Sequence, residues 1–234
     1  MGKKLKITLI VLIVLVIASG IYLTSYYHAE SPATDYLNGT ANVSVEKTSS
    51  GLFVDGYGND TLLIFYPGAK VEYSSYLPMF VELADRGVDC YLVEMPFNLA
   101  FFGSDSADAI IENTSYENYF LSGHSLGGAM AAQYTSHSNK TDGLILLASY
   151  SQESINVPTL SIYGSNDSVL NMEKYNESKP LFKSNFTEFI INGGNHAQFG
   201  YYGNQSGDGQ ANISAENQQK QCVDEIIKFI EYYT

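Results

Sequence analysis

The sequence predicts an α/β fold in which a mainly parallel sheet carries helices on both faces. Short apolar runs alternate with amphipathic stretches from residue 43 to the end of the chain. Fully apolar runs such as residues 62–66 are typical of strands buried on both faces. Strands that alternate with helices connect in parallel. About 190 residues are enough for one domain with a substantial core, and no internal repeat or interdomain linker interrupts them.

The strands follow from these apolar runs and from the turns that bound them. A short hairpin is expected first, and Pro67-Gly68 then ends the strand that follows it. The expected strands lie at 42–46, 51–55, 61–66, 89–94, 119–122, 143–148, 159–163 and 186–191.

The helices follow from apolar residues at helical spacing. In the first, Tyr76, Met79, Phe80 and Leu83 share one face, and Gly87 is a suitable stop. The last helix carries a similar apolar stripe, which would pack it on the sheet. The expected helices lie at 74–86, 106–112, 126–136, 173–182 and 215–233.

Residues 1–28 are expected to form a signal anchor that spans a membrane. Residues 7–23 are 17 residues without a charge, near the short end of what crosses a bilayer at about 1.5 Å per residue. Lysines within residues 3–6 precede this run and should stay cytoplasmic, which leaves the rest of the chain extracytoplasmic. Two alternatives stay open: a signal peptide cleaved near 18–20, which would give a secreted protein, and a buried core helix.

Residues 29–42 are polar and are expected to link this anchor to a domain that spans 43–234. The formal net charge of −13 argues against a nucleic-acid partner, because no basic patch is available to neutralise phosphates. No His/Cys cluster has the spacing of a metal site, and neither a metal nor an organic cofactor is expected. Whether Cys90 and Cys222 pair is left open.

The most informative motif is Gly-His-Ser-Leu-Gly at 123–127. It lies between an apolar strand and a helix of small residues, the setting in which a serine is held on a strained turn with its hydroxyl exposed. Glycines at both ends allow the strand and the helix to approach closely. Such a pattern also arises by chance, so the strand before it and the helix after it are the stronger evidence for a functional serine. Ser125 is the candidate nucleophile.

A serine needs a base to take its proton, and His196 is the candidate. His28 lies beside the membrane segment, and His137 ends the helix after the turn. His124 neighbours Ser125, but adjacent residues on a tight turn face different ways. His196 directly follows an apolar strand, which places it at the carboxyl edge of the sheet with Ser125.

Asp167 is the candidate carboxylate that orients His196. It follows the strand at 159–163 and therefore lies at the same edge. The alternatives for Asp167 are a turn residue or a helix N-cap. Glu153 follows the preceding strand and stays possible, whereas Asp142 precedes its strand and lies on the wrong edge.

An oxyanion that develops during acyl transfer needs two donors. The backbone N–H of Leu126 is expected to be one, because it follows the nucleophile. The other should come from the loop after the strand at 61–66, where Ala69 is the first choice and Gly68 the second.

These motifs resemble those of the α/β-hydrolase superfamily, over roughly residues 50–234. The matching segments are Gly-His-Ser-Leu-Gly-Gly, Tyr-Pro-Gly-Ala, Tyr-Gly-Ser-Asn-Asp and Gly-Asn-His. Residues 66–76 and 95–100 further resemble a compact bacterial and archaeal branch whose members are known only as hydrolases. The resemblance implies the α/β-hydrolase fold with a roughly eight-stranded sheet, and a triad of Ser125, His196 and Asp167 in the chain order Ser, Asp, His.

The chain departs from many superfamily members at residues 149–157. This short connection leaves no room for the lid domain that others insert there, so an open site is expected. Two aromatic loops, 98–102 and 199–203, lie at the expected active-site edge. Phe101 and Tyr201 are candidates to shape an apolar acyl or aryl pocket; ordinary loop packing is the alternative.

The sequence thus predicts a membrane-anchored, extracytoplasmic serine hydrolase that cleaves an ester or thioester through an acyl-enzyme. Its partners would be a small-molecule ester or acyl substrate and the membrane itself. Three alternatives stay open. They are an acyltransferase or peptidase on the same scaffold, a non-catalytic α/β-hydrolase-like binding module, and a surface structural protein.

Overall fold

Eight strands form one sheet in the part of the chain that the computed structural model describes, residues 2–58 and 60–234. Met1, Asn59 and the Lys3 side chain lie outside that part. The strand order is β1-β2-β4-β3-β5-β6-β7-β8, with only the β1–β2 and β2–β4 pairs antiparallel. The predicted mainly parallel, eight-stranded sheet is confirmed. The strands are β1 (Ser44–Lys47), β2 (Gly51–Asp55), β3 (Thr61–Tyr66), β4 (Asp89–Val93), β5 (Asn118–His124), β6 (Gly143–Leu147), β7 (Thr159–Gly164) and β8 (Phe186–Ile191).

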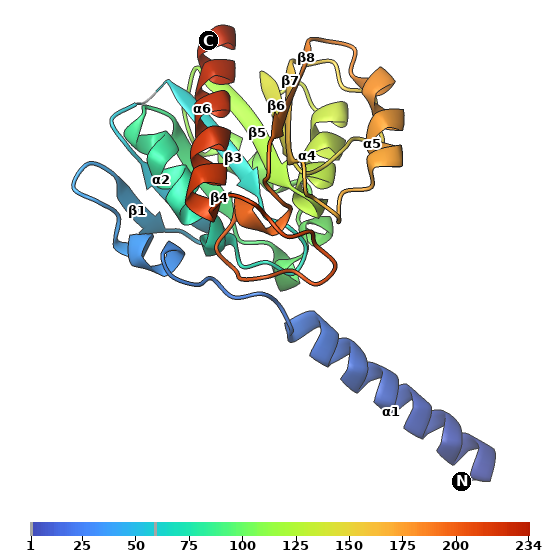
Figure 1. Cartoon of the computed structure of the whole chain (residues 1–234). Coiled ribbons are helices and arrows are strands. Elements are labelled where there is room, and N and C mark those ends of the chain that lie inside the picture. The colour runs from blue at the N-terminus through green and yellow to red at the C-terminus, as the bar shows by residue number, and fades with distance from the viewer. Residues whose placement is uncertain (1, 59) are drawn as a thin grey trace.

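Helices cover both faces of this sheet (Figure 1). One face packs on α2 (Leu77–Asp85) and α6 (Ala215–Tyr233), and the other on α3 (Ser106–Glu112) and α4 (Leu126–His137). Successive residues of β3 point to opposite faces. Leu63 and Phe65 therefore join the first core cluster, whereas Leu62 and Ile64 join the second. Every residue of β3 is buried, as its apolar run predicts.

Two helices are shorter than predicted, and a proline stands at each difference. The helix expected at 74–86 begins as a 3-10 turn, Tyr73–Tyr76, and becomes α-helical at Leu77, because Pro78 suits a first helical turn. Helix α5 (Met172–Ser178) gives way to the 3-10 turn Lys179–Leu181, where Pro180 lacks the N–H that would continue an α-helix.

Helix α1 (Lys3–Thr24) projects away from the domain (Figure 1). Residues 4–24 have a mean hydropathy of 2.7, none of this stretch is buried, and its length and composition suit a membrane span or a signal sequence. The chain joins the domain at once after α1. The Tyr27 N–H donates to Lys70 O at 2.7 Å, and the Glu72 N–H donates to Tyr27 O at 2.9 Å.

The segment expected to be a linker, 29–42, lies against the domain. It contains the 3-10 turn Ala33–Asn38, whose Ala33 is fully buried. The Glu30 N–H donates to Tyr201 O at 2.9 Å, and Asn42 Nδ2 donates to Asp85 Oδ1 at 3.1 Å. Backbone bonds hold this polar segment, and hydropathy does not reveal such bonds. The domain start at residue 43 stays a prediction.

Residues 148–158 join β6 to β7 without a helix. Ile155 forms a single bridge with Phe182, and no other regular element interrupts the connection among the described residues. The structure therefore has no lid domain at this position, as the sequence predicts.

Candidate active site

Ser125 occupies a strained turn between β5 and α4. Its backbone angles are φ 53° and ψ −120°, a region that residues other than glycine rarely adopt. Three hydrogen bonds hold it there. The Ser125 N–H donates to Leu147 O at 2.9 Å, and the Ser125 carbonyl accepts from Ser149 Oγ at 2.7 Å and from the Ala129 N–H at 3.1 Å. Strain maintained by surrounding contacts is typical of a nucleophile elbow.

Two glycines permit this turn. A Cβ on Gly123 would lie 2.5 Å from the backbone of Gly127 and Gly128, and a Cβ on Gly127 would lie 2.1 Å from Tyr66 O. Real Cβ atoms do not approach backbone so closely. The start of α4 can thus contact the ends of β5 and β3 only because both positions lack a side chain.

His196 and Asp167 form a buried pair at the carboxyl edge of the sheet. His196 Nδ1 lies 2.8 Å from Asp167 Oδ2, and each side chain is only 1% exposed. The other carboxylate oxygen, Oδ1, accepts the N–H groups of Val169 and Leu170, each at 2.8 Å. These two bonds fix the carboxylate so that Oδ2 faces the imidazole.

The second ring nitrogen of His196, Nε2, is buried and has no hydrogen-bond partner among the described residues. The His196 ring lies 4.5 Å, centroid to centroid, from that of His124, the residue directly before Ser125. The structure therefore places the His196 ring beside the turn that carries Ser125, and no hydrogen bond joins the two residues in the described part of the chain. Such bonds are often long in the absence of substrate and shorten only in the reacting complex.

His124 belongs to a second buried group. Tyr76 Oη lies 2.8 Å from His124 Nδ1 and accepts the Gly68 N–H at 3.1 Å. Burial lowers the pKa of His124 well below its ordinary range, and the neighbouring His196 lowers it further. His124 therefore resists protonation, and its Nδ1 is already engaged by Tyr76 Oη.

The proposed oxyanion donors, Ala69 and Leu126, differ from the alternative, Gly68, in whether the backbone N–H is free. Among the described residues, neither the Ala69 N–H nor the Leu126 N–H donates a hydrogen bond to a protein acceptor. The Gly68 N–H is already used by Tyr76 Oη. Of the two residues considered in this loop, Ala69 is the one with a free donor.

The other candidates from the sequence lie away from this group. Glu153 is exposed, and the Asp142 carboxylate accepts the Tyr119 N–H at the opposite end of β5. His28 lies 3.4 Å from Glu72, and His137 contacts the Gln133 carbonyl within its own helix.

Comparison with known sequences identifies the family. A sequence model of the Alpha/beta hydrolase family matches residues 62–220, more than half of the chain. The chain belongs to this family. The matched interval contains Ser125, Asp167 and His196. No curated protein sequence matches the chain.

Solved structures of other alpha/beta hydrolases share the fold of this one at low sequence identity. A predicted hydrolase from Thermoplasma acidophilum is 14% identical, with a TM-score of 0.61, and the match covers 79% of this chain and 98% of that one. A monoacylglycerol lipase from Paleococcus ferrophilus is also 14% identical, with a TM-score of 0.57 and coverage of 74% and 97%. Esterase 2 from Thermogutta terrifontis, solved phosphoramylated by tabun, is 12% identical, with a TM-score of 0.59 and coverage of 83% and 97%.

Sequence analysis did not identify two residues that position the His196 loop of this alpha/beta hydrolase. Gln218 of α6 is fully buried, and its amide donates to Asn195 O at 2.7 Å and accepts the Asn195 N–H at 2.9 Å. Asp208 accepts the N–H groups of Ala197 at 2.9 Å and Ser168 at 3.3 Å. One signal was present: Gln218 interrupts the apolar stripe of α6.

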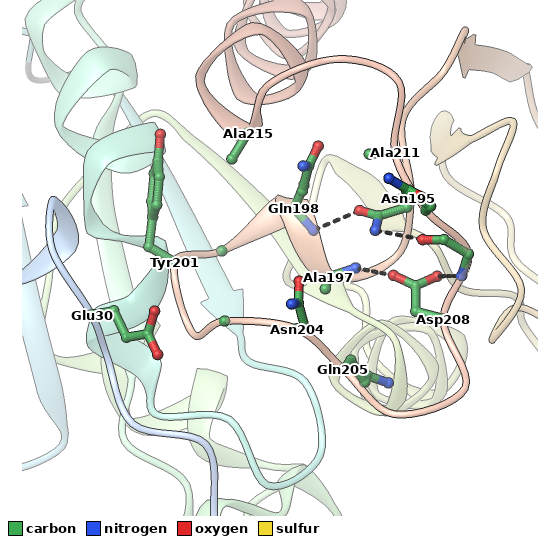
Figure 2. A pocket seen from close by; sticks show the side chains of 14 residues that line it. Glu30, Asn195, Ala197, Gln198, Tyr201, Asn204, Gln205, Asp208, Ala211 and Ala215 are labelled. Carbon is green, nitrogen blue, oxygen red and sulfur yellow. Dashed lines mark hydrogen bonds between the residues drawn. The ribbon is translucent and has the colours of Figure 1, made fainter.

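A polar hollow of about 580 Å³ lies beside the His196 loop (Figure 2). Tyr201 lines it, together with amide and carboxylate groups. Tyr201 also lines a second hollow of about 640 Å³, to which Met79 and Val81 contribute apolar side chains. Phe101 lines neither hollow and is 67% exposed, and a pocket role for Phe101 and Tyr201 stays a prediction. The polar residues of the first hollow include Glu30, Asn195, Gln198, Asn204, Gln205 and Asp208.

Proposed function

We propose that this alpha/beta hydrolase cleaves an ester or thioester by a serine nucleophile and an acyl-enzyme intermediate. The observation that carries the proposal is the strained Ser125 at the edge where the buried His196–Asp167 pair presents an unpartnered Nε2. A strained, partly exposed serine and a free imidazole nitrogen are what nucleophilic attack on a carbonyl requires.

The first half-reaction forms the acyl-enzyme. Ser125 Oγ attacks the carbonyl carbon while its proton moves to His196 Nε2. Asp167 Oδ2 accepts the Nδ1–H, which keeps Nε2 free as the base and stabilises the imidazolium that forms. The N–H groups of Ala69 and Leu126 hold the negative oxygen. His196 then returns the proton to the leaving alcohol or thiol as the carbon–oxygen or carbon–sulfur bond breaks.

The second half-reaction releases the acyl group. Water gives a proton to His196 Nε2 and attacks the acyl carbon, and the bond to Ser125 Oγ breaks as His196 protonates that oxygen. The products are a carboxylic acid and the free enzyme. The absence of a lid between β6 and β7 leaves the path for water open.

A fluorophosphonate probe tests the nucleophile. The full-length protein should become labelled, and Ser125→Ala should not. Ser206→Ala is the matched control, because Ser206 is exposed and lies outside the triad. Labelling of Ser125→Ala at the parent rate would refute the assignment. Hydrolysis of a short p-nitrophenyl ester by the parent protein separates an enzyme from a non-catalytic binding module.

Water and other acyl acceptors are separated by product analysis. Added alcohol or amine should not divert the acyl group from the free acid if water is the natural acceptor. Preferential formation of the new ester or amide would instead assign an acyltransferase.

We further propose that α1 stays in the membrane with the catalytic domain outside the cell. The hydropathy of α1 and the lysines at its start support this proposal. The protein should then stay in membranes washed with alkaline carbonate and be accessible to external protease. A mature N-terminus near residue 20 would show cleavage instead.

A further inference from the structure

Three phenylalanines are exposed together on one loop. Phe97, Phe101 and Phe102 are 52%, 67% and 53% exposed. The Phe102 ring lies 5.8 Å from that of Phe97 and 5.5 Å from that of Phe101, centroid to centroid, so the three rings form one patch. Exposed apolar side chains that gather in this way mark an interaction surface, whereas single ones are ordinary.

The backbone holds this aromatic patch outward. Phe97 and Asn98 have φ values of 56° and 54°, which residues with a side chain rarely adopt. The Lys70 N–H donates to Asn98 O at 2.6 Å, and Ala100 is fully buried next to the rings. The loop is thus fixed to the domain on both sides of the strained residues. Strain maintained in this way is a reason to look for a function of the exposed rings.

The patch lies beside the end of α1. Lys70 Nζ donates to Leu23 O at 2.9 Å and to Phe97 O at 3.4 Å, so one side chain contacts both the last turn of α1 and the aromatic loop. The same ammonium group lies 5.1 Å from the centre of the Tyr22 ring. Tyrosine and lysine at the end of an apolar helix are typical of the membrane–water interface.

The chain between α1 and the domain is short. Only Ser25 and Tyr26 separate Thr24, where α1 ends, from Tyr27, which already pairs with Val71. At about 3.3–3.6 Å per residue, the domain lies within about 10 Å of the end of α1. If α1 spans a bilayer, the aromatic patch must therefore lie at the bilayer surface.

The carboxyl edge of the sheet, which carries the candidate active site, lies on the same side of the domain as α1. Ala69, the proposed oxyanion donor, directly precedes Lys70, whose ammonium contacts Leu23. In Figure 1, α1 leaves the domain at the bottom of the view, and the C-terminal end of α6 lies at the top. The carboxyl edge of the sheet and α1 are thus on one side of the molecule.

We propose that this edge docks on the bilayer that holds α1, with Phe97, Phe101 and Phe102 in the interface, and that the site takes acyl esters resident in that bilayer. The substrate part rests on the proposed hydrolase function, and the docking part rests on the proposed membrane anchor alone. A net charge of −13 disfavours an anionic surface, so a zwitterionic phosphatidylcholine bilayer is the partner that fits.

Tryptophan fluorescence tests the docking, because the chain contains no tryptophan. Full-length Phe102→Trp and Tyr232→Trp are each reconstituted in phosphatidylcholine vesicles with or without brominated acyl chains. Tyr232 is 77% exposed and lies near the C-terminus, at the opposite end of the domain. Brominated lipid should quench Phe102→Trp and leave Tyr232→Trp unchanged. The same result is expected in the Ser125→Ala background, because docking needs no catalysis.

Two outcomes of this measurement overturn the docking. One is equal quenching, or none, at both positions. The other is an unquenched Phe102→Trp with blue-shifted emission, which would assign the patch to a second copy or another protein. If quenching is specific but fluorophosphonate labels nothing, the docking stands and the proposed hydrolase function fails.

The substrate class is tested by a ratio of two rates. The double variant Phe97→Ser/Phe102→Ser is compared with Tyr232→Ser on a long-chain ester in phosphatidylcholine vesicles and on a short water-soluble ester. The ratio of the vesicle rate to the soluble rate should fall on the order of tenfold in the double variant, the size expected for partial burial of two aromatic rings. It should not change in Tyr232→Ser. An unchanged ratio in the double variant would show that the patch does not serve substrate capture.

Discussion

Tyr76 Oη lies 2.8 Å from Nδ1 of His124 and accepts the N–H of Gly68 at 3.1 Å. One buried hydroxyl thus joins the loop that carries the proposed oxyanion donor to the residue before Ser125. Tyr76 is fully buried, and burial raises the pKa of its hydroxyl far above the usual range, so it stays protonated. The two halves of the candidate site are connected through this group.

Tyr76→Phe should destabilise the domain. The change leaves the Gly68 N–H without an acceptor in a buried place, which costs about 1–3 kcal/mol in the free energy of unfolding. Urea denaturation of the full-length protein in detergent measures the loss. Tyr57→Phe, at an exposed tyrosine, is the control and should change stability by less than about 0.5 kcal/mol. Equal stability of the two variants would contradict a structural role for the Tyr76 hydroxyl.

Asp167→Asn should remove activity without unfolding the site. The amide keeps Oδ1, which accepts from Val169 and Leu170, but its NH₂ cannot accept the His196 Nδ1–H. The imidazole then takes the wrong tautomer, and kcat should fall on the order of 10⁴-fold. Steady-state kinetics and a thermal scan measure the two effects. Asp167→Ala should lose the loop bonds as well and unfold at lower temperature. Activity of Asp167→Asn within tenfold of the parent would mean that another carboxylate serves His196.

Stability should fall in mild acid because of His124. Its pKa lies well below the ordinary value of 6.5 in the folded state, through burial and the neighbouring His196. Below that value the unfolded chain binds a proton that the folded chain does not. The free energy of unfolding therefore falls as pH drops below 6.5, by up to about 1.4 kcal/mol per pH unit for this one group.

Urea denaturation between pH 7.5 and 5 measures this slope. His124→Asn should flatten it, whereas His137→Asn, at an exposed histidine, should keep it. Identical slopes in the parent and in His124→Asn would assign the acid sensitivity to other groups.

Reducing agents should not change the stability of the folded protein. Cys90 and Cys222 are both free and buried, and burial raises the pKa of each thiol. Two thiols should therefore react with a maleimide only after unfolding. The thermal midpoint with and without dithiothreitol should be the same. A lower midpoint under reduction would reveal a disulfide between the two cysteines.

The centre of the sheet could be predicted because its strands are apolar along most of their length. The runs at β3 and β6 are buried on both faces, and such a composition is typical of central strands. The Ser125 turn was predictable for a different reason, since its motif and the strand and helix on either side lie within one short segment. The backbone that requires Gly123 is that of Gly127 and Gly128, whereas the contact that requires Gly127 is with the distant Tyr66 O.

What could not be predicted depends on contacts between distant residues. Tyr76 and His124 are 48 positions apart, and neither side chain alone indicates the other. The bond from the Glu30 N–H to Tyr201 O uses backbone groups, which every residue carries, so the polar segment 29–42 looks like a linker although it packs on the domain. The polar character of the hollow beside Tyr201 likewise depends on Glu30, which is close to the N-terminus and far from Tyr201 in the sequence.

The two hydrogen bonds between Gln218 and Asn195 have a consequence for biosynthesis. The loop that holds His196 is fixed by a helix that leaves the ribosome only after every strand of the sheet has been made. A nascent chain that lacks α6 can carry Ser125 on its turn, but its histidine loop has no such support. The enzyme should therefore gain activity only when its last helix has been translated, which delays hydrolysis until the domain has folded.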